Sequence, residues 1–163
     1  MAELHPACAP LEFLLGTWRG TGTGAYPTIE DFSYDEEISF SHLGRPFVAY
    51  VQKTKHAGTG LPLHAEAGYL RPQGAGRVEL VLAQPSGIAE VLNGTVEGRD
   101  LRLASTAVVG TPLAKPVTAT QRRLWIEGEI LFSSVAMAAM GRDLQHHVVS
   151  EMHRSRPEVF RRP

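Results

Sequence analysis

The chain has 163 residues, 43% of them hydrophobic, which is enough for one domain with a substantial core. Its 16 basic and 17 acidic residues give a formal charge of -1, so it lacks the basic field with which nucleic-acid-binding proteins neutralise phosphates. No apolar run reaches the roughly 18 residues of a membrane span, and the N-terminus lacks the basic start and apolar run of a signal peptide. We therefore expect a cytoplasmic protein that binds neither nucleic acid nor membranes.

The N-terminal segment contains the single cysteine of the chain, Cys8. One cysteine excludes an intramolecular disulfide and a cysteine-rich metal site, and it fits a reducing compartment. We interpret Cys8 as a free thiol in a flexible N-terminus. Directly after it, the segment from Pro10 to Leu15 predicts a short helix, because proline suits a first helical turn and Gly16 suits the end of a helix.

The rest of the chain alternates with the period of two that is typical of β-strands. Phe32, Tyr34, Ile38 and Phe40 share one parity, and polar residues take the other. Similar segments are separated by Gly, Pro, Asn or Asp about every ten residues. They predict about ten strands, at 18–24, 32–40, 47–54, 64–70, 77–83, 89–96, 101–108, 117–125, 130–137 and 147–153.

These strands have no linker or internal repeat between them, so closing the sheet on itself accommodates them best and leaves no unpaired edge. We expect one all-β domain over residues 1–163: a ten-stranded antiparallel β-barrel, similar to lipocalins and fatty-acid-binding proteins, with a short N-terminal helix. The ordered barrel is expected over about 10–155 and a basic tail over 156–163. A barrel of this size can enclose one small ligand.

Histidine is the residue type most suited to metal chemistry here, since the chain has seven and no cysteine cluster. His146 and His147 are adjacent and must point to opposite faces of a strand, so one of them can face the interior. Strand parity alone does not select between them. If Val148 and Met152 face inward, His147 reaches the interior only at a bend or bulge.

Other catalytic patterns are missing from the sequence. It has no Gly-x-Ser-x-Gly elbow, no phosphate-binding loop followed by lysine and no His-Glu-x-x-His zinc pair. The glycines at 20, 22 and 24 lack a strand-loop-helix context, so they indicate a bend or a close backbone approach rather than a dinucleotide loop. The small and flexible side chains from Ser133 to Met140 either pack against bulkier neighbours or line a cavity for a flat apolar ligand.

Several short motifs occur in a recognisable order. They are Gly16-Thr17-Trp18-Arg19-Gly20-Thr21-Gly22 with Tyr26-Pro27-Thr28-Ile29, Phe32-x-Tyr34-x-Glu36-Glu37, His42-x-Gly44-x-Pro46, Leu63-His64-x-Glu66-x-Gly68-Tyr69, and Leu144-Gln145-x-His147. Together they resemble the nitrobindin family across nearly the whole chain. The resemblance implies a ten-stranded barrel that holds one ferric haem b at an open end, binds nitric oxide and isomerises peroxynitrite to nitrate.

The same resemblance implies roles for particular residues. His147 matches the axial haem ligand, in preference to His153 and with His146 as the runner-up. Thr28, Met137 and the distal residues Leu63 and His64 match haem contacts, while Gly16, Trp18, Gly20 and Gly22 carry the family motif. Leu63 stands where some relatives have Met. His64 either donates a hydrogen bond to a bound ligand or lies exposed at the rim. A ligating His147 needs an acceptor for its other ring nitrogen, for which a backbone carbonyl would serve.

Two other functions remain open at this point. A haem-free barrel that carries a lipid or another apolar small molecule explains the strand pattern equally well. A haem protein that senses or carries nitric oxide without turnover is the second alternative. The implied chemistry assigns no general base, and a homodimer with the exposed haem edge at its contact is also left open.

Overall fold

The computed structural model describes residues 2–155 and shows a closed antiparallel barrel. A 3-10 helix, η1 (Pro6–Leu14), precedes the strands β1 (Gly16–Tyr26), β2 (Ile29–Ser41), β3 (Val48–His56), β4 (Pro62–Gly74), β5 (Arg77–Gln84), β6 (Ile88–Glu97), β7 (Asp100–Gly110), β8 (Val117–Glu127), β9 (Ile130–Ala139) and β10 (Gln145–Arg154). Each strand pairs with its neighbours in sequence, and β10 pairs with β1 to close the ring. The expected ten-stranded all-β barrel is therefore confirmed; the predicted tail at 156–163 lies outside the described residues.

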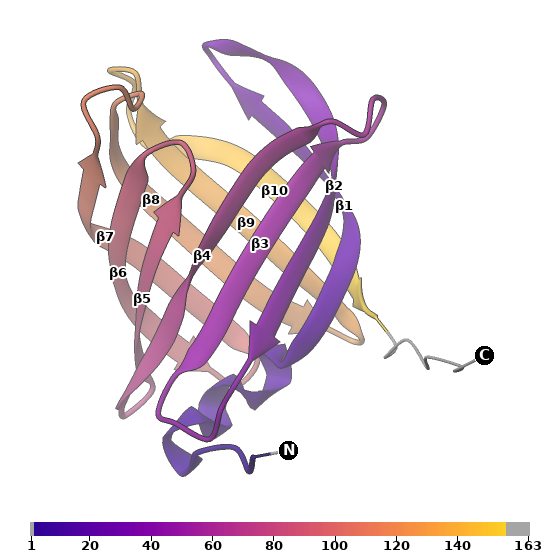
Figure 1. The fold of residues 1–163 in the computed structure, drawn as a ribbon, viewed down its shortest axis with the longest axis vertical. Helices are drawn as coiled ribbons and strands as arrows, with labels where there is room; N and C mark the ends of the chain where they lie inside the picture. The colour runs from indigo at the N-terminus through magenta and orange to yellow at the C-terminus, as the bar shows by residue number, and fades with distance from the viewer. Residues whose placement is uncertain (1, 156–163) are drawn as a thin grey trace.

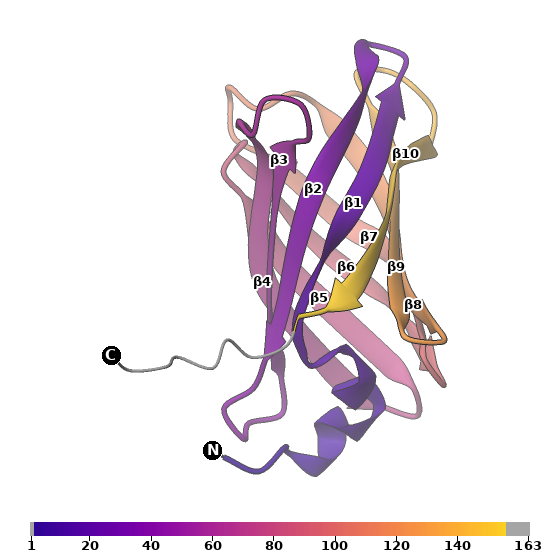
Figure 2. The ribbon, with the colours of Figure 1, turned by 90° about the vertical axis from the view of Figure 1, so that its right-hand side faces the viewer.

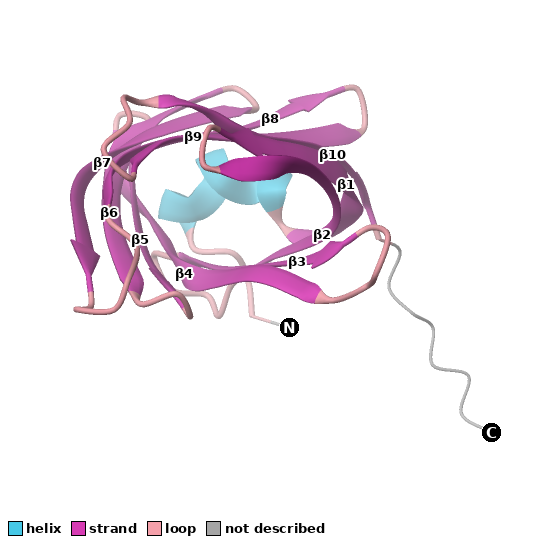
Figure 3. Ribbon diagram, turned by 90° about the horizontal axis from the view of Figure 1, so that it is seen from above, coloured by secondary structure: helices cyan, strands magenta, loops and turns pink. Residues whose placement is uncertain are grey.

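The connections divide between the two ends of the barrel. Turns from β1 to β2, β3 to β4, β5 to β6, β7 to β8 and β9 to β10 lie at one end, the upper end of Figures 1 and 2. Helix η1 lies across the other end, as the view through the ring in Figure 3 shows. The hydrophobic core includes Leu11 and Leu14 of η1 together with Trp18 and Leu131 of the barrel. The apolar core thus reaches the helix end, which leaves the upper end for a binding site.

The N-terminal helix differs from the prediction. It starts at Pro6 rather than Pro10, which lies inside it, and the His5 side chain accepts a hydrogen bond from the Ala7 amide at its start. A 3-10 helix has three residues per turn, so Cys8, Leu11 and Leu14 share the face that packs into the core. The expectation of a flexible Cys8 is therefore wrong, and burial raises the pKa of its thiol. Within residues 2–155, no helix has the length and apolar character of a membrane span.

The motif glycines of β1 create room for neighbouring groups. A Cβ atom on Gly20 would overlap the backbone carbonyl of Glu151 on β10, and one on Gly22 would overlap the Tyr34 ring. Gly24 leaves the same room for the ring of Phe32. Trp18 joins this strand to the helix, since its indole nitrogen donates a hydrogen bond of 2.7 Å to the Leu14 carbonyl. The motif therefore holds the helix at one end of β1 and makes room for two aromatic rings near the other end. This agrees with the expectation that glycines in a strand allow neighbouring groups to approach closely.

Substituting Gly20 by alanine should destabilise the barrel. The overlapping atom belongs to the backbone of β10, so the strands must separate locally, and overpacking of this kind costs about 1–3 kcal/mol. Urea unfolding should show the lower stability directly. Thr21→Ala, at the adjacent exposed position, is the matched control and is expected to change the free energy of unfolding by less than about 0.5 kcal/mol. Equal stability of the two variants would contradict the close contact.

Candidate functional site

A cavity of about 640 Å³ opens at the upper end of the barrel. This volume lies within the roughly 300–1,000 Å³ that is usual for sites of small molecules and cofactors. Its apolar wall comes from several strands and consists of Ile29, Phe32, Leu63, Ile88, Val117, Val135, Met137 and Val148. Polar side chains lie among them, including two histidines, His64 and His147. The cavity can thus hold a largely apolar molecule and offer it nitrogen ligands.

His147 reaches this cavity because β10 carries a bulge. Along the pairing with β9, His146 lies opposite Ala136 and the next pair joins Val148 to Val135, so His147 is the extra residue. A bulge of this kind re-aims one side chain and lets consecutive residues share a face. Val148 and His147 accordingly both line the cavity. The bend that an inward His147 requires is present at this position.

The ring of His147 is held in one orientation. Its Nδ1 atom lies 3.1 Å from the carbonyl oxygen of Ala25, which sits at a second irregularity, between β1 and β2. A carbonyl only accepts, so Nδ1 carries the hydrogen and Nε2 keeps its lone pair. The rings of Tyr26 and Phe32 pack edge-on against the imidazole, with centroids at 5.4 and 6.4 Å. Burial lowers the pKa of His147, which favours the neutral form that can ligate a metal.

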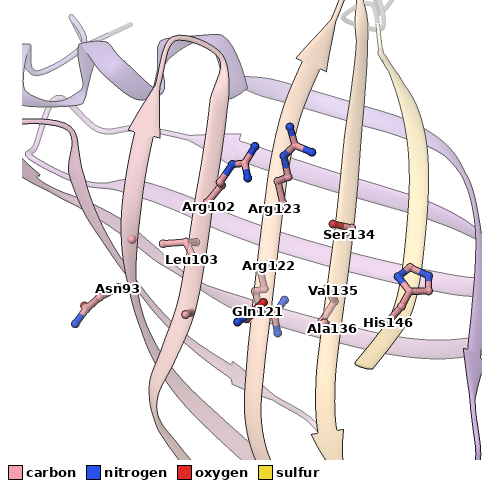
Figure 4. Close-up of a pocket in the computed structure, with 12 residues that line it drawn as sticks. Asn93, Arg102, Leu103, Gln121, Arg122, Arg123, Ser134, Val135, Ala136 and His146 are labelled. Atoms are coloured by element: carbon pink, nitrogen blue, oxygen red, sulfur yellow. The ribbon is translucent and has the colours of Figure 1, made fainter. Parts of the chain in front are cut away.

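His146 points elsewhere. It is exposed and lines a hollow on the outside of the barrel wall, beside Ser134 and Ala136 of β9 (Figure 4). His153, near the end of β10, is exposed as well. Of the three histidines on this strand, only His147 lines the upper cavity. The bulge therefore decides which of the two neighbouring imidazoles faces the cavity, a choice that strand parity left open.

The other predicted site residues divide into two groups. Leu63, His64 and Met137 all line the cavity, together with the exposed Lys115 from the connection between β7 and β8. Thr28 lies exposed in the turn between β1 and β2 and is not among the lining residues. The side chain of His64 is 38% exposed, as expected for a residue at the rim, and it also lines the cavity.

A layer of buried charged groups lies across the barrel at the bottom of the cavity. Arg122 of β8 contacts Glu66 of β4 through both of its terminal nitrogens, at 2.5 and 3.0 Å, and contacts Glu90 of β6 at 2.6 Å. Glu66 also accepts a hydrogen bond of 2.6 Å from the hydroxyl of Tyr50, and Thr120 donates to Glu90. We call these five residues the polar floor. Buried charges persist only when they are paired in this way.

The polar floor was missed by the sequence reasoning, although a signal was present. Glu66 shares the inward parity of Leu70 on β4, and Glu90 shares that of Ile88 and Leu92 on β6. A charged residue at a strand position whose neighbours on the same face are buried and apolar predicts a buried partner of opposite charge. The sequence does not name that partner, because Arg122 lies 56 residues from Glu66 and 32 from Glu90 along the chain.

The polar floor should make stability fall in acid. Burial raises the pKa of Glu66, but the charge of Arg122 and the hydrogen bonds from His64 and Arg122 outweigh it and lower the pKa from 4.5 to about 2. A carboxyl with a lowered folded-state pKa stabilises the fold fully above its unfolded value and loses this as the pH falls through its folded value. Urea unfolding should thus show a decline in stability between about pH 4.5 and about 2. Glu66→Gln should lack this component; an identical decline would contradict the assignment.

The comparisons with known proteins agree with this arrangement. Residues 7–154 match the model of the family described as "THAP4-like, heme-binding beta-barrel domain". The chain is 52% identical over 158 residues to "Peroxynitrite isomerase 2" of Mycobacterium avium, covering 94% of this chain and 98% of that protein. It is 48% identical over 155 residues to "Peroxynitrite isomerase" of Nocardia farcinica, covering 93% and 92%.

Solved structures show the same fold. The crystal structure of Rv2717c from M. tuberculosis superposes with a TM-score of 0.88 at 45% identity, covering 94% of this chain and all of that one. The S-type phycobiliprotein lyase CPES of Guillardia theta shares the fold alone, with a TM-score of 0.62 at 10% identity over 89% of this chain and 90% of that one. The resemblance inferred from the motifs is thereby confirmed: the chain belongs to the THAP4-like, haem-binding β-barrel domain family.

Proposed function

We propose that this protein is a haem-dependent peroxynitrite isomerase that holds one haem b through Nε2 of His147. The observation that carries the proposal is the geometry of His147, a half-buried imidazole with Nδ1 committed to the Ala25 carbonyl and Nε2 left as a ligand. A hydrogen bond at the second nitrogen is the usual way in which proteins fix a metal-ligating histidine. The names of the relatives, at 48–52% identity over almost their whole length, support the activity.

The residues around the cavity fit a haem. Its apolar wall suits a flat macrocycle, and Met137 can adapt to the face of the ring. Lys115, at the connection between β7 and β8, supplies a positive charge that suits a haem propionate. Leu63 and His64 line the same cavity and are the distal residues in this proposal. The cavity walls also limit the access of water to whatever is bound.

When bound, haem would supply Lewis-acid and redox chemistry toward peroxynitrite. The protein contributes the rest of the site. His147 would hold the metal through Nε2, and the bulge together with the Ala25 carbonyl holds its ring in place. Nitric oxide is a second small molecule that we infer can enter this cavity.

Haem-free transport of an apolar molecule is the weaker alternative, because the family is described as haem-binding. The polar floor also argues against a carrier of fatty acids anchored at the bottom of the barrel. Arg122, the one arginine lining this cavity among the described residues, already has both terminal nitrogens paired with two carboxylates, so its charge is compensated before a ligand carboxylate arrives.

Titration with haemin tests the cofactor. We expect a Soret band of histidine-ligated ferric haem that saturates at one equivalent per chain, and a pyridine haemochrome spectrum of haem b. A flat titration would refute the haem assignment. Nitrate yield from peroxynitrite, measured with and without haem, then separates an isomerase from a sensor or carrier, because only the isomerase increases the yield.

A further inference from the structure

The cavity contains a histidine whose hydrogen bonding the proposed function leaves unexplained. His64 and Glu66 are two residues apart on β4, so their side chains lie on the same face of the strand. Nε2 of His64 lies 3.2 Å from one carboxylate oxygen of Glu66. His64 lines the cavity, whereas Glu66 is 3% exposed and belongs to the polar floor. The pair therefore joins the surface of the cavity to the fixed charges beneath it.

Glu66 is itself held rigidly. Its other oxygen, Oε1, receives the Tyr50 hydroxyl at 2.6 Å and one guanidinium nitrogen of Arg122 at 2.5 Å. The oxygen that meets His64 also receives the second nitrogen of Arg122, at 3.0 Å. Such a two-point contact fixes the plane of the carboxylate. Glu66 is thus a rigid acceptor rather than a mobile counter-ion.

A carboxylate fixed in its ionised form can only accept hydrogen bonds, so Nε2 of a neutral His64 must carry the hydrogen. The other ring nitrogen, Nδ1, then keeps a lone pair. Within residues 2–155, the hydrogen bonds of His64 involve its backbone nitrogen, its backbone oxygen and Nε2, and none involves Nδ1. A neutral His64 in this arrangement cannot donate a hydrogen bond to a ligand in the cavity, because its single donor is committed to Glu66. This differs from the sequence-based expectation of donation.

We propose that Glu66 is a positioning residue which fixes His64 as a hydrogen-bond acceptor, so that the cavity favours ligands that carry a hydrogen on oxygen, such as peroxynitrous acid, over their anions. The choice of peroxynitrous acid as the ligand rests on the proposed function. The orientation of His64 rests only on its contact with Glu66. Electrostatics act in the same direction, since two carboxylates of the polar floor face the single guanidinium of Arg122. An anion placed above this floor meets an acceptor lone pair and the net negative charge of the floor, while the positive charge of Lys115 on the same cavity is the one assigned to a haem propionate.

The tautomer of His64 can be measured in the haem-free protein. Two-bond nitrogen–proton NMR spectra distinguish the two neutral forms of each imidazole, and we expect His64 to have its hydrogen on Nε2. The opposite tautomer in the wild-type protein would overturn the proposal. In Glu66→Gln, the amide can donate as well as accept, so the nitrogen shifts of His64 should move toward a mixture of tautomers.

Tyr50→Phe is the matched control. It removes a hydrogen bond from the same carboxylate but on the oxygen that does not meet His64, so the His64 nitrogen shifts should stay as in the wild type. If both variants moved these shifts equally, the effect would be a general loosening of the polar floor and the positioning role would be refuted. If Glu66→Gln fails to fold, the wild-type tautomer decides the orientation of His64: hydrogen on Nδ1 refutes the proposal, and hydrogen on Nε2 supports it.

The haem-loaded protein provides the functional arm. Removing the partner that orients a metal-ligating histidine typically costs about 10–100-fold in activity, and by analogy we expect the rate constant for peroxynitrite decay to fall by about tenfold in Glu66→Gln. Haem affinity should be unchanged, because His147 is untouched. An unchanged rate constant would overturn the role in ligand selection. If the wild type lacks isomerase activity but shows the expected tautomer, the proposed function fails while the positioning of His64 stands.

Discussion

Replacing His147 by alanine should abolish the Soret spectrum of a histidine-ligated haem and weaken haem binding by more than about 100-fold. This bound follows from the 10–100-fold that is lost when only a group behind a metal ligand is removed, since His147 is proposed as the ligand itself. The cavity should persist, because His147 is only partly buried and is not a member of the hydrophobic core. Absorption titration with haemin measures the loss.

His146→Ala is the matched control for this experiment. The two histidines are adjacent, yet the bulge in β10 turns His147 into the cavity and leaves His146 against the hollow on the outer wall (Figure 4). We expect His146→Ala to retain the wild-type spectrum and affinity. The reverse pattern, with the spectrum lost only in His146→Ala, would move the ligand by one residue and show that the bulge has a different register.

Replacing Arg122 by methionine should cost about 3–5 kcal/mol, the loss typical of removing one partner of a buried ion pair. The arginine is the shared cation of two buried carboxylates, Glu66 and Glu90, and methionine fills the space without compensating their charge. Protonation of a carboxylate can recover part of the loss in acid. The free energy of unfolding at neutral pH, from urea titration, is the measurement.

The neighbouring residue provides the control. Arg123 points to the outside of the same strand, where it pairs with Asp100 at 2.9 Å and lies 4.2 Å from the centre of the Trp125 ring. Surface ion pairs contribute about 0–1 kcal/mol, so Arg123→Met should lower stability by no more than about 1 kcal/mol. Similar losses for the two variants would mean that the polar floor is not the stabilising feature that its burial indicates.

Much of the barrel was predictable because the signal is local. Alternation of side chains along each segment reflects one face in water and one in the core, and turn residues mark where strands end. Each of the ten predicted strands overlaps one observed strand. The N-terminal helix was less predictable. Cys8, Leu11 and Leu14 are spaced by three, and this spacing indicates a 3-10 helix only once the three side chains are known to pack on the core.

The candidate site was predictable only in part. The family resemblance pointed to His147, Leu63, His64 and Met137, all of which line the cavity. It also pointed to Thr28, which the structure places in an exposed turn. Neither the acceptor for Nδ1 of His147 nor the partner of Glu66 follows from a motif, because each contact joins strands far apart in the chain: 122 residues for Ala25 and His147, and 56 for Glu66 and Arg122.

The sequence alone determined that the chain forms a ten-stranded β-barrel with several histidines available to a ligand, since periodicity and turn residues act over a few positions. Motif order added the expected family. Only the tertiary structure decided which histidine enters the cavity, because one extra residue in β10 changes the face of a side chain and periodicity does not reveal it. The tertiary structure also decided which ring nitrogen each histidine offers to a ligand. Closure of the barrel brings the Ala25 carbonyl to Nδ1 of His147, and the pairing of charges inside the barrel fixes Glu66 beside Nε2 of His64.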